Sequence, residues 1–69
     1  MKINVNGEEK SIELDQENVL LSKALNSMGY QPNTIVAELN NLIINSIKWG
    51  EVNLKEGDIL EIVSIVGGG

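Results

Sequence analysis

The stretch NVLLSKALNSMGYQP at residues 18–32 decides the fold, because the hydrophobic pattern changes here to a helical period. Its apolar residues recur at intervals of three and four and so lie on one side of a helix; they are Leu20, Leu21, Ala24, Leu25 and Met28. Asn18 is a suitable N-cap, Gly29 suits the left-handed position after a helix, and Pro32 prevents continuation. We therefore predict one amphipathic helix at about residues 19–28.

A period of two precedes this helix. Apolar and polar residues alternate on both sides of Asn6-Gly7. This dipeptide favours a type I′ hairpin turn, in which both central residues need a positive φ. The first fourteen residues are thus predicted to form a β-hairpin, and its inner face carries Ile3, Val5, Ile12 and Leu14.

Short strands are predicted after the helix, at about 34–39 and 42–44, with a turn at Asn40-Asn41 between them. The first of these strands directs Ile35, Ala37 and Leu39 inward. An irregular stretch at 45–54 carries Trp49 toward the core. A turn at 55–58 then leads into the last strand, from 59 to about 66.

This order of elements is typical of an α+β fold in which one helix crosses a mixed sheet of four to five strands. The last strand must pair beside the first, because Ile3 and Val5 otherwise lack neighbours on the sheet. The arrangement is the β-grasp, or ubiquitin-like, fold. We expect one β-grasp domain at 1–66 and a flexible glycine tail at 67–69.

Composition excludes several classes of function. The 69 residues include ten acids and five lysines, and no cysteine, histidine or arginine. A net charge of −5 argues against nucleic acids and anionic membranes as partners, and suits a basic protein partner; acids that merely solvate a small domain are the alternative. Thiolate and histidine metal sites and the Ser–His–Asp triad are impossible. With no signal-peptide pattern at the start and no membrane-spanning apolar run, we expect a cytoplasmic protein.

The sequence ends in Val66-Gly67-Gly68-Gly69. Glycine weakens strands and is costly to order, so a strand that runs into three glycines needs an explanation. A frayed end or a cloning remnant is one. The other is chemical: Gly67 and Gly68 let the backbone thread a narrow channel, and Gly69 presents a carboxylate without a side chain. Such a carboxylate could be activated as an acyl-adenylate and then carry sulfur, which no cysteine here can do.

The chain also resembles the ThiS family of sulfur carriers over nearly its whole length. The residues that carry the resemblance are 35–40 (IVAELN), Ile43-Ile44, Trp49, 54–58 (LKEGD), 61–63 (EIV) and the final VGGG. Asn41 stands where the family commonly has glycine, and Asn45 and Ser46 stand where proline and a basic residue are common. We therefore expect the loop after the short strand to meet partners in a different way.

The resemblance implies a cycle of reactions at Gly69. A ThiF-like enzyme adenylates the carboxylate with ATP, and a cysteine-desulfurase relay supplies sulfur to give a thiocarboxylate. Thiazole synthase (ThiG) then takes the sulfur into the thiazole ring of thiamine. The chain is thus expected to be a protein co-substrate and not an enzyme, with no permanently bound cofactor and ATP consumed by the activating enzyme. Two alternatives stay open: the small subunit of molybdopterin synthase and a ubiquitin-like protein modifier.

Partner binding is predicted on the outer face of the sheet. If Leu60 and Ile62 point into the core, the alternate residues of the last strand point the opposite way. An apolar cluster on an outer face often marks a docking site; here its expected members are Val36, Val63 and Ile65, with Ile59 and Glu61 on the same face. Isolated exposed apolar residues are the alternative interpretation.

Overall fold

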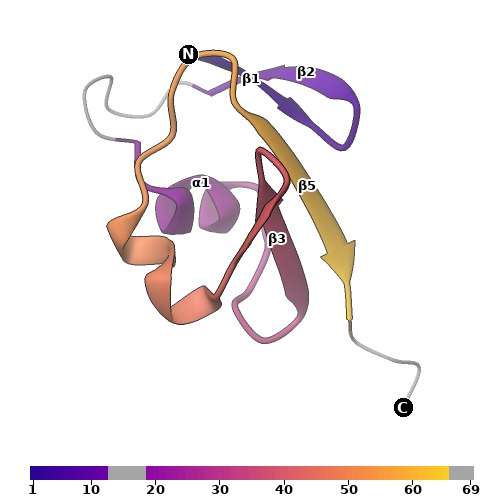
Figure 1. Cartoon of the computed structure of the whole chain (residues 1–69), viewed down its shortest axis with the longest axis vertical. Coiled ribbons are helices and arrows are strands. Elements are labelled where there is room, and N and C mark those ends of the chain that lie inside the picture. The colour runs from indigo at the N-terminus through magenta and orange to yellow at the C-terminus, as the bar shows by residue number, and fades with distance from the viewer. Residues whose placement is uncertain (13–18, 66–69) are drawn as a thin grey trace.

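The computed structural model describes residues 1–12 and 19–65. It contains a mixed sheet with the strand order β2-β1-β5-β3-β4 (Figure 1). Its strands are β1 (Lys2–Val5), β2 (Glu8–Ser11), β3 (Ile35–Leu39), β4 (Leu42–Ile44) and β5 (Ile59–Ser64). Helix α1 (Leu21–Ser27) and the 3₁₀-helix η1 (Ser46–Glu51) lie together on one side of the sheet. The predicted β-grasp fold is confirmed.

The first and last strands pair, as predicted, and they run parallel. Val5 lies beside Leu60 in this pair, whereas β5 pairs antiparallel with β3 on its other side. Strand β5 is therefore central to the sheet. Its alternate residues Leu60 and Ile62 are buried and help to build the core.

The N-terminal hairpin forms around the predicted turn, with φ values of 51° at Asn6 and 84° at Gly7. Ile3, Val5 and Ile12 are buried, which confirms the predicted inner face at these positions. Leu14 lies outside the described residues. All four residues of β2 are exposed, because this strand lies at the edge of the sheet.

The helix begins later than predicted, at Leu21, and the N-cap position belongs to Leu20. The prediction that Asn18 caps the helix is therefore wrong, and Asn18 itself lies outside the described residues. Backbone pairing replaces a side-chain cap: the amide of Leu21 donates to the carbonyl of Val52 at 2.8 Å, and the amide of Leu54 donates to that of Val19 at 2.7 Å. A distant segment thus provides the acceptor for the first amide of the helix and holds the residues before it in place.

The end of the helix follows the prediction. Gly29 has a φ of 90°, the left-handed conformation that glycine adopts readily. The amide of Tyr30 donates to the carbonyl of Leu25 and that of Gly29 to the carbonyl of Asn26, both at 3.0 Å. These two bonds define a Schellman motif, which turns the chain from α1 toward β3.

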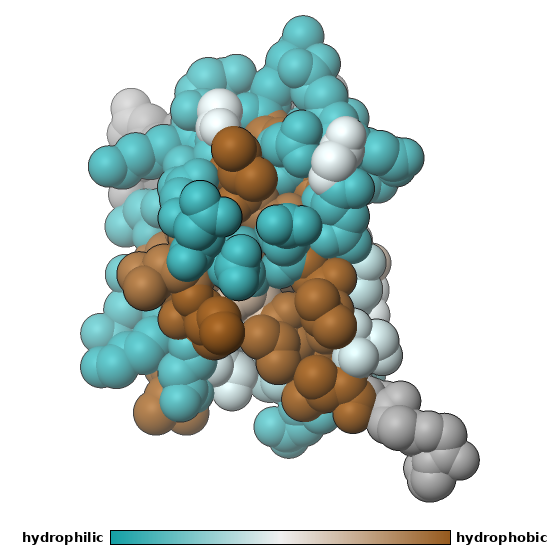
Figure 2. All heavy atoms as spheres, turned by 45° about the vertical axis from the view of Figure 1, so that its right-hand side comes forward, coloured by the Kyte–Doolittle hydropathy of each residue, from teal (hydrophilic) through white to brown (hydrophobic). Residues whose placement is uncertain are grey.

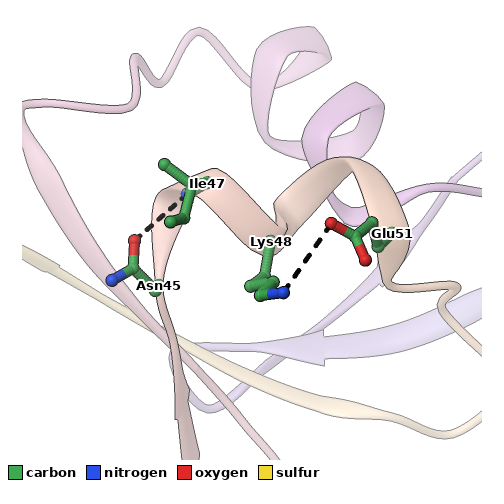
Figure 3. Close-up of polar contacts among 4 residues, drawn as sticks. All are labelled: Asn45, Ile47, Lys48 and Glu51. Carbon is green, nitrogen blue, oxygen red and sulfur yellow. Dashed lines mark hydrogen bonds and ion pairs between the residues drawn. The ribbon is translucent and has the colours of Figure 1, made fainter.

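The stretch predicted as irregular contains the 3₁₀-helix η1. The Asn45 side chain starts it by accepting a hydrogen bond from the amide of Ile47 at 3.1 Å, and Lys48 lies 4.0 Å from Glu51 on its exposed side (Figure 3). Trp49 is buried as predicted, and its indole Nε1 donates to the Ile44 carbonyl at 2.9 Å. The exposed ion pair adds little stability, so Trp49 is what fixes η1 against the core.

Candidate functional site

The predicted reactive tail, Gly67, Gly68 and Gly69, lies outside the described residues, as does Val66. The structure does describe the strand that leads to it and the sheet face beside it. Ser64 lies opposite Ile35 at the end of the β3–β5 ladder. The amide of Ile65 continues this pairing by donating to the Thr34 carbonyl at 2.9 Å. Backbone pairing therefore extends to the last described residue.

Two asparagine side chains hold β5 where its neighbouring strands turn away. The Oδ1 atom of Asn6 accepts from the amide of Ile62 at 2.7 Å, and that of Asn40 accepts from the amide of Ile59 at 2.9 Å. Both asparagines have positive φ values, of 51° and 50°. In each case a side-chain oxygen takes the place of a backbone acceptor, so β5 is anchored from both sides.

The outer face of β5 has the predicted parity. Leu60 is fully buried, whereas Val63 and Ile65 are 61% and 54% exposed. Ile59, also predicted on this face, is 52% exposed. Val36 lies opposite Val63 and is half-buried. The structure thus brings Val36, Val63 and Ile65 to one side of the β3–β5 pair, and their role in binding stays a prediction.

A shallow hollow of about 350 Å³ lies on this face. It is lined by Val36, Glu38, Ile43, Glu61 and Val63. The apolar surface is visible in Figure 2, in which the side of the molecule that carries β5 is turned forward. The hollow connects β3, β4 and β5, so it forms a surface that no single strand provides.

Ile43 was not among the predicted site residues, although it is 65% exposed beside this hollow. A signal for it exists in the sequence. The two-residue turn at Asn40-Asn41, with φ values of 50° and 71°, fixes the register of the hairpin. It places Ile43 opposite Glu38 and therefore on the outer face.

The hollow also contains two carboxylates. Glu38 and Glu61 are directly opposite each other in the β3–β5 ladder. Within residues 1–12 and 19–65, the structure shows one ion pair, between Lys48 and Glu51, which involves neither of them. The face is therefore both apolar and negatively charged.

A second hollow, of about 340 Å³, lies at the opposite end of the sheet around Lys2, Asn4 and Glu56. Glu56 accepts a hydrogen bond from the backbone amide of Lys2 at 3.0 Å, which ties the loop before β5 to β1. This carboxylate has a structural role. In the described part of the chain, no three carboxylates are grouped to bind a metal ion, and no helix is long and apolar enough to cross a membrane.

The chain is similar to known proteins in sequence. A model of the ThiS family matches residues 3–69. A thiazole synthase of Magnetococcus marinus is 33% identical over 69 residues, and one of Paramagnetospirillum magneticum is 30% identical over the same length. These matches cover 100% of this chain but 20% of each synthase. An uncharacterised protein, ycf40, of Trieres chinensis is 39% identical over 49 residues, which are 71% of this chain and 67% of that protein.

The fold has solved counterparts. A crystal structure of a thiamine biosynthesis protein (ThiS) from Geobacter metallireducens superimposes with a TM-score of 0.82, and each chain is covered completely. An NMR solution structure of a thiamine biosynthesis protein from the same organism gives a TM-score of 0.79 and covers 100% of this chain and 88% of that one. Both are 24% identical to this chain, so the likeness supports the fold.

Proposed function

Because the chain belongs to the ThiS family of small sulfur-carrier proteins, we propose that it carries sulfur on the carboxyl group of Gly69 for thiazole formation in thiamine biosynthesis. A sulfur carrier is consumed and regenerated as a protein co-substrate, and it is not itself a catalyst. The observation that supports this proposal is the family match, which extends from residue 3 to Gly69.

The proposed chemistry changes the carboxyl group of Gly69 in three steps. A carboxylate oxygen of Gly69 attacks the α-phosphorus of ATP and pyrophosphate leaves, which gives an acyl-adenylate. The terminal sulfur of a persulfide from a cysteine-desulfurase relay then attacks the carbonyl carbon and AMP leaves, which gives an acyl disulfide. A thiol reductant cleaves the S–S bond of this intermediate, which releases the thiocarboxylate and leaves a disulfide between the reductant and the relay cysteine. The chain has no cysteine, so no thiol side chain of its own can carry the sulfur.

The proposed shape of the molecule suits this chemistry. We propose that residues 1–66 form the folded domain and that Gly67, Gly68 and Gly69 form a flexible tail that enters the active sites of its partners. Glycine has no Cβ and adopts a wide range of φ values, so it can thread a narrow channel. The observed pairing of β5 as far as Ile65 supports a rigid base for such a tail.

The thiazole synthase matches support one partner, and the proposed adenylation requires a second. Since two thiazole synthases each contain a segment similar to this whole chain, a domain of this kind is joined covalently to a synthase in those proteins. Covalent joining raises the effective concentration of groups that must meet. We propose that this chain meets a separate thiazole synthase and, earlier, a ThiF-like adenylating enzyme, both in the cytoplasm.

The proposed docking surface comprises Val36, Val63 and Ile65. All three lie on the outer face of the β3–β5 pair, and Val63 and Ile65 are more than half exposed. Ile65 is also four residues from Gly69. A partner seated on this surface would therefore lie within reach of the tail.

The test compares the intact chain with a variant that lacks Gly68 and Gly69. We expect the deletion to abolish ATP-dependent activation by the adenylating enzyme, because the reactive carboxylate is displaced from its site. The melting temperature should barely change, because a terminal tail contributes few contacts. Gly68→Val should act almost as strongly, since a β-branched side chain restricts the backbone and needs room in the channel.

Gly50→Ala is the matched control. Gly50 lies in η1, and a Cβ built there meets no atom within 4 Å. This variant should keep both its melting temperature and its activation. Mass spectrometry of the chain recovered from its native cell should find one terminal oxygen replaced by sulfur and locate the change at Gly69. Activation of the truncated chain at the rate of the intact one would refute the proposal.

A further inference from the structure

The pair of carboxylates in the outer hollow has no counterpart elsewhere in the described sheet. Glu38 and Glu61 face each other across β3 and β5, and Ile43 of β4 lies opposite Glu38 on its other side. Two pairs further along the ladder, on the same face, Val36 lies opposite Val63. Two negatively charged side chains thus lie side by side, next to the aliphatic side chains of Val36, Ile43 and Val63.

This arrangement does not stabilise the chain by itself. Like charges directly opposite each other on a sheet repel and are destabilising. All five lysines belong to the described residues, and none lies within 4.0 Å of either carboxylate. A cation between Glu38 and Glu61 would relieve the repulsion and interact with both charges. Burial by a partner would lower the local dielectric constant and strengthen both interactions.

We propose that this hollow receives an arginine side chain from a partner protein. The planar guanidinium can donate hydrogen bonds to both carboxylates at once, whereas an ammonium group acts as a point charge. The aliphatic part of the arginine would pack on Val36, Val63 and Ile43, as long basic side chains do on apolar surfaces. The net charge of −5 would draw a basic surface toward this face.

The same pair argues against a second copy of the chain as the occupant. A symmetric dimer through this face would bring the Glu38 and Glu61 side chains of one copy toward those of the other. Four carboxylates would then meet in a surface that supplies no cation. A partner of opposite charge is the occupant that the chemistry favours.

The inference rests on the proposed function. It assigns to Glu38 and Glu61 the role of fixing the orientation of the bound partner. Glu61 is four residues before Ile65, where the described strand pairing ends. An arginine held by Glu61 and Glu38 would fix the partner relative to β5, and so relative to the base of the tail. The apolar residues provide contact area, and the carboxylates provide the register.

The test measures binding of the full chain to the thiazole synthase from the same cell at several salt concentrations. The double variant Glu38→Gln and Glu61→Gln removes the charges and keeps the side-chain size. We expect its dissociation constant to rise about 3- to 30-fold at low salt, and the salt dependence of binding to become shallower. Its melting temperature should stay the same or rise, because the repulsion is removed.

Two further variants make the result decisive. Glu8→Gln removes a carboxylate from exposed β2 and should leave binding nearly unchanged. Val63→Asp disrupts the proposed docking surface itself and should abolish binding.

If Val63→Asp abolishes binding and the double variant binds like Glu8→Gln, the carboxylate pair has no such role, although the docking surface stands. If the intact chain does not bind the synthase at all, the proposed function fails instead. Self-association through this face would also overturn the inference.

Discussion

The two hairpins of this sheet close with the same kind of turn and yet produce opposite edges. Both turns have two residues with positive φ, at Asn6-Gly7 and at Asn40-Asn41. Strand β2 follows the first turn with the exposed sequence EEKS, whereas β4 follows the second with LII. A charged edge strand resists pairing with other chains, and an apolar one can support contact. The turns therefore close both hairpins, and the residues that follow each turn decide whether its edge strand is charged or apolar.

The hairpins also share a connection to the central strand. The Asn6 side chain bonds to the amide of Ile62, and the Asn40 side chain bonds to the amide of Ile59. The first bond is partly buried and the second is exposed. Hence the asparagine bond should contribute more to the free energy of unfolding in the N-terminal hairpin than in the other. Substitution of each asparagine measures this difference.

The largest loss of stability is expected on truncation of Leu60, which pairs with a strand of each hairpin. Its side chain is fully buried, and it lies beside Val5 on one side and Leu39 on the other. Leu60→Ala should lower the free energy of unfolding by about 2–5 kcal/mol, because it removes buried methyl groups and leaves a cavity. Chemical denaturation with far-UV circular dichroism measures this loss.

Ile59→Ala is the control for Leu60→Ala. Ile59 is the preceding residue in β5, but it is 52% exposed, so the same truncation there should cost much less. Equal losses for the two variants would show that Leu60 is not the point at which the hairpins join, and that the two sides of the sheet are stabilised independently.

Most of the fold could be predicted from local patterns. The dipeptides at both turns, the glycine after the helix and the alternation in β5 each depend on residues close together in sequence, and the structure confirms them. The start of the helix could not be predicted in this way. The carbonyl of Val52 satisfies the amide of Leu21, and only the folded chain brings these residues together.

The candidate site also contains residues that local patterns predict and residues that they do not. The alternation of β5 was sufficient to place Val63 and Ile65 on the outer face. The pairing of Glu38 with Glu61 depends on the register between β3 and β5, which are separated by β4 and η1. Register across such a separation is set by tertiary packing, so this pair was not foreseen. The bond from Asn6 to Ile62, 56 residues away, was missed for the same reason.

A smaller effect is expected when the two asparagine bonds are removed. Asn6→Gly and Asn40→Gly both keep a residue that tolerates positive φ. The first removes the acceptor of the Ile62 amide, and the second removes the acceptor of the Ile59 amide together with the exposed bond that the Asn40 Nδ2 atom donates to Asp58 at 3.0 Å. Asn6→Gly should lower the free energy of unfolding by about 1–2 kcal/mol, since the Ile62 amide is left partly buried without its acceptor. Asn40→Gly should cost less, because both of its bonds are exposed and water can reach the Ile59 amide and the Asp58 carboxylate. Thermal unfolding of the two variants in parallel gives the comparison.

Asn41→Gly provides the reference for both variants. Asn41 also has a positive φ, of 71°, and its side chain makes no hydrogen bond with the described residues. It should therefore show only the effect of adding a glycine to a turn. If Asn6→Gly is no more destabilising than Asn41→Gly, the bond to Ile62 does not hold β5, and the hairpins differ only in their edges.

The smallest effect on stability, with a large one on binding, is expected where the edges differ. Ile43 and Glu9 belong to the second strands of their hairpins and are exposed. Ile43→Thr and Glu9→Thr should each change the free energy of unfolding by no more than about 0.5 kcal/mol, because surface substitutions away from the core rarely do more and threonine suits a strand. Only Ile43→Thr should weaken binding to thiazole synthase, since it removes an apolar contact from the outer hollow. Calorimetric titration at about 0.15 M salt, where distant charges are largely screened, separates that contact from the charge change at Glu9. If both variants weakened binding equally, the partner would contact both edges of the sheet. The apolar edge at β4 would then contribute no more to docking than the charged edge at β2.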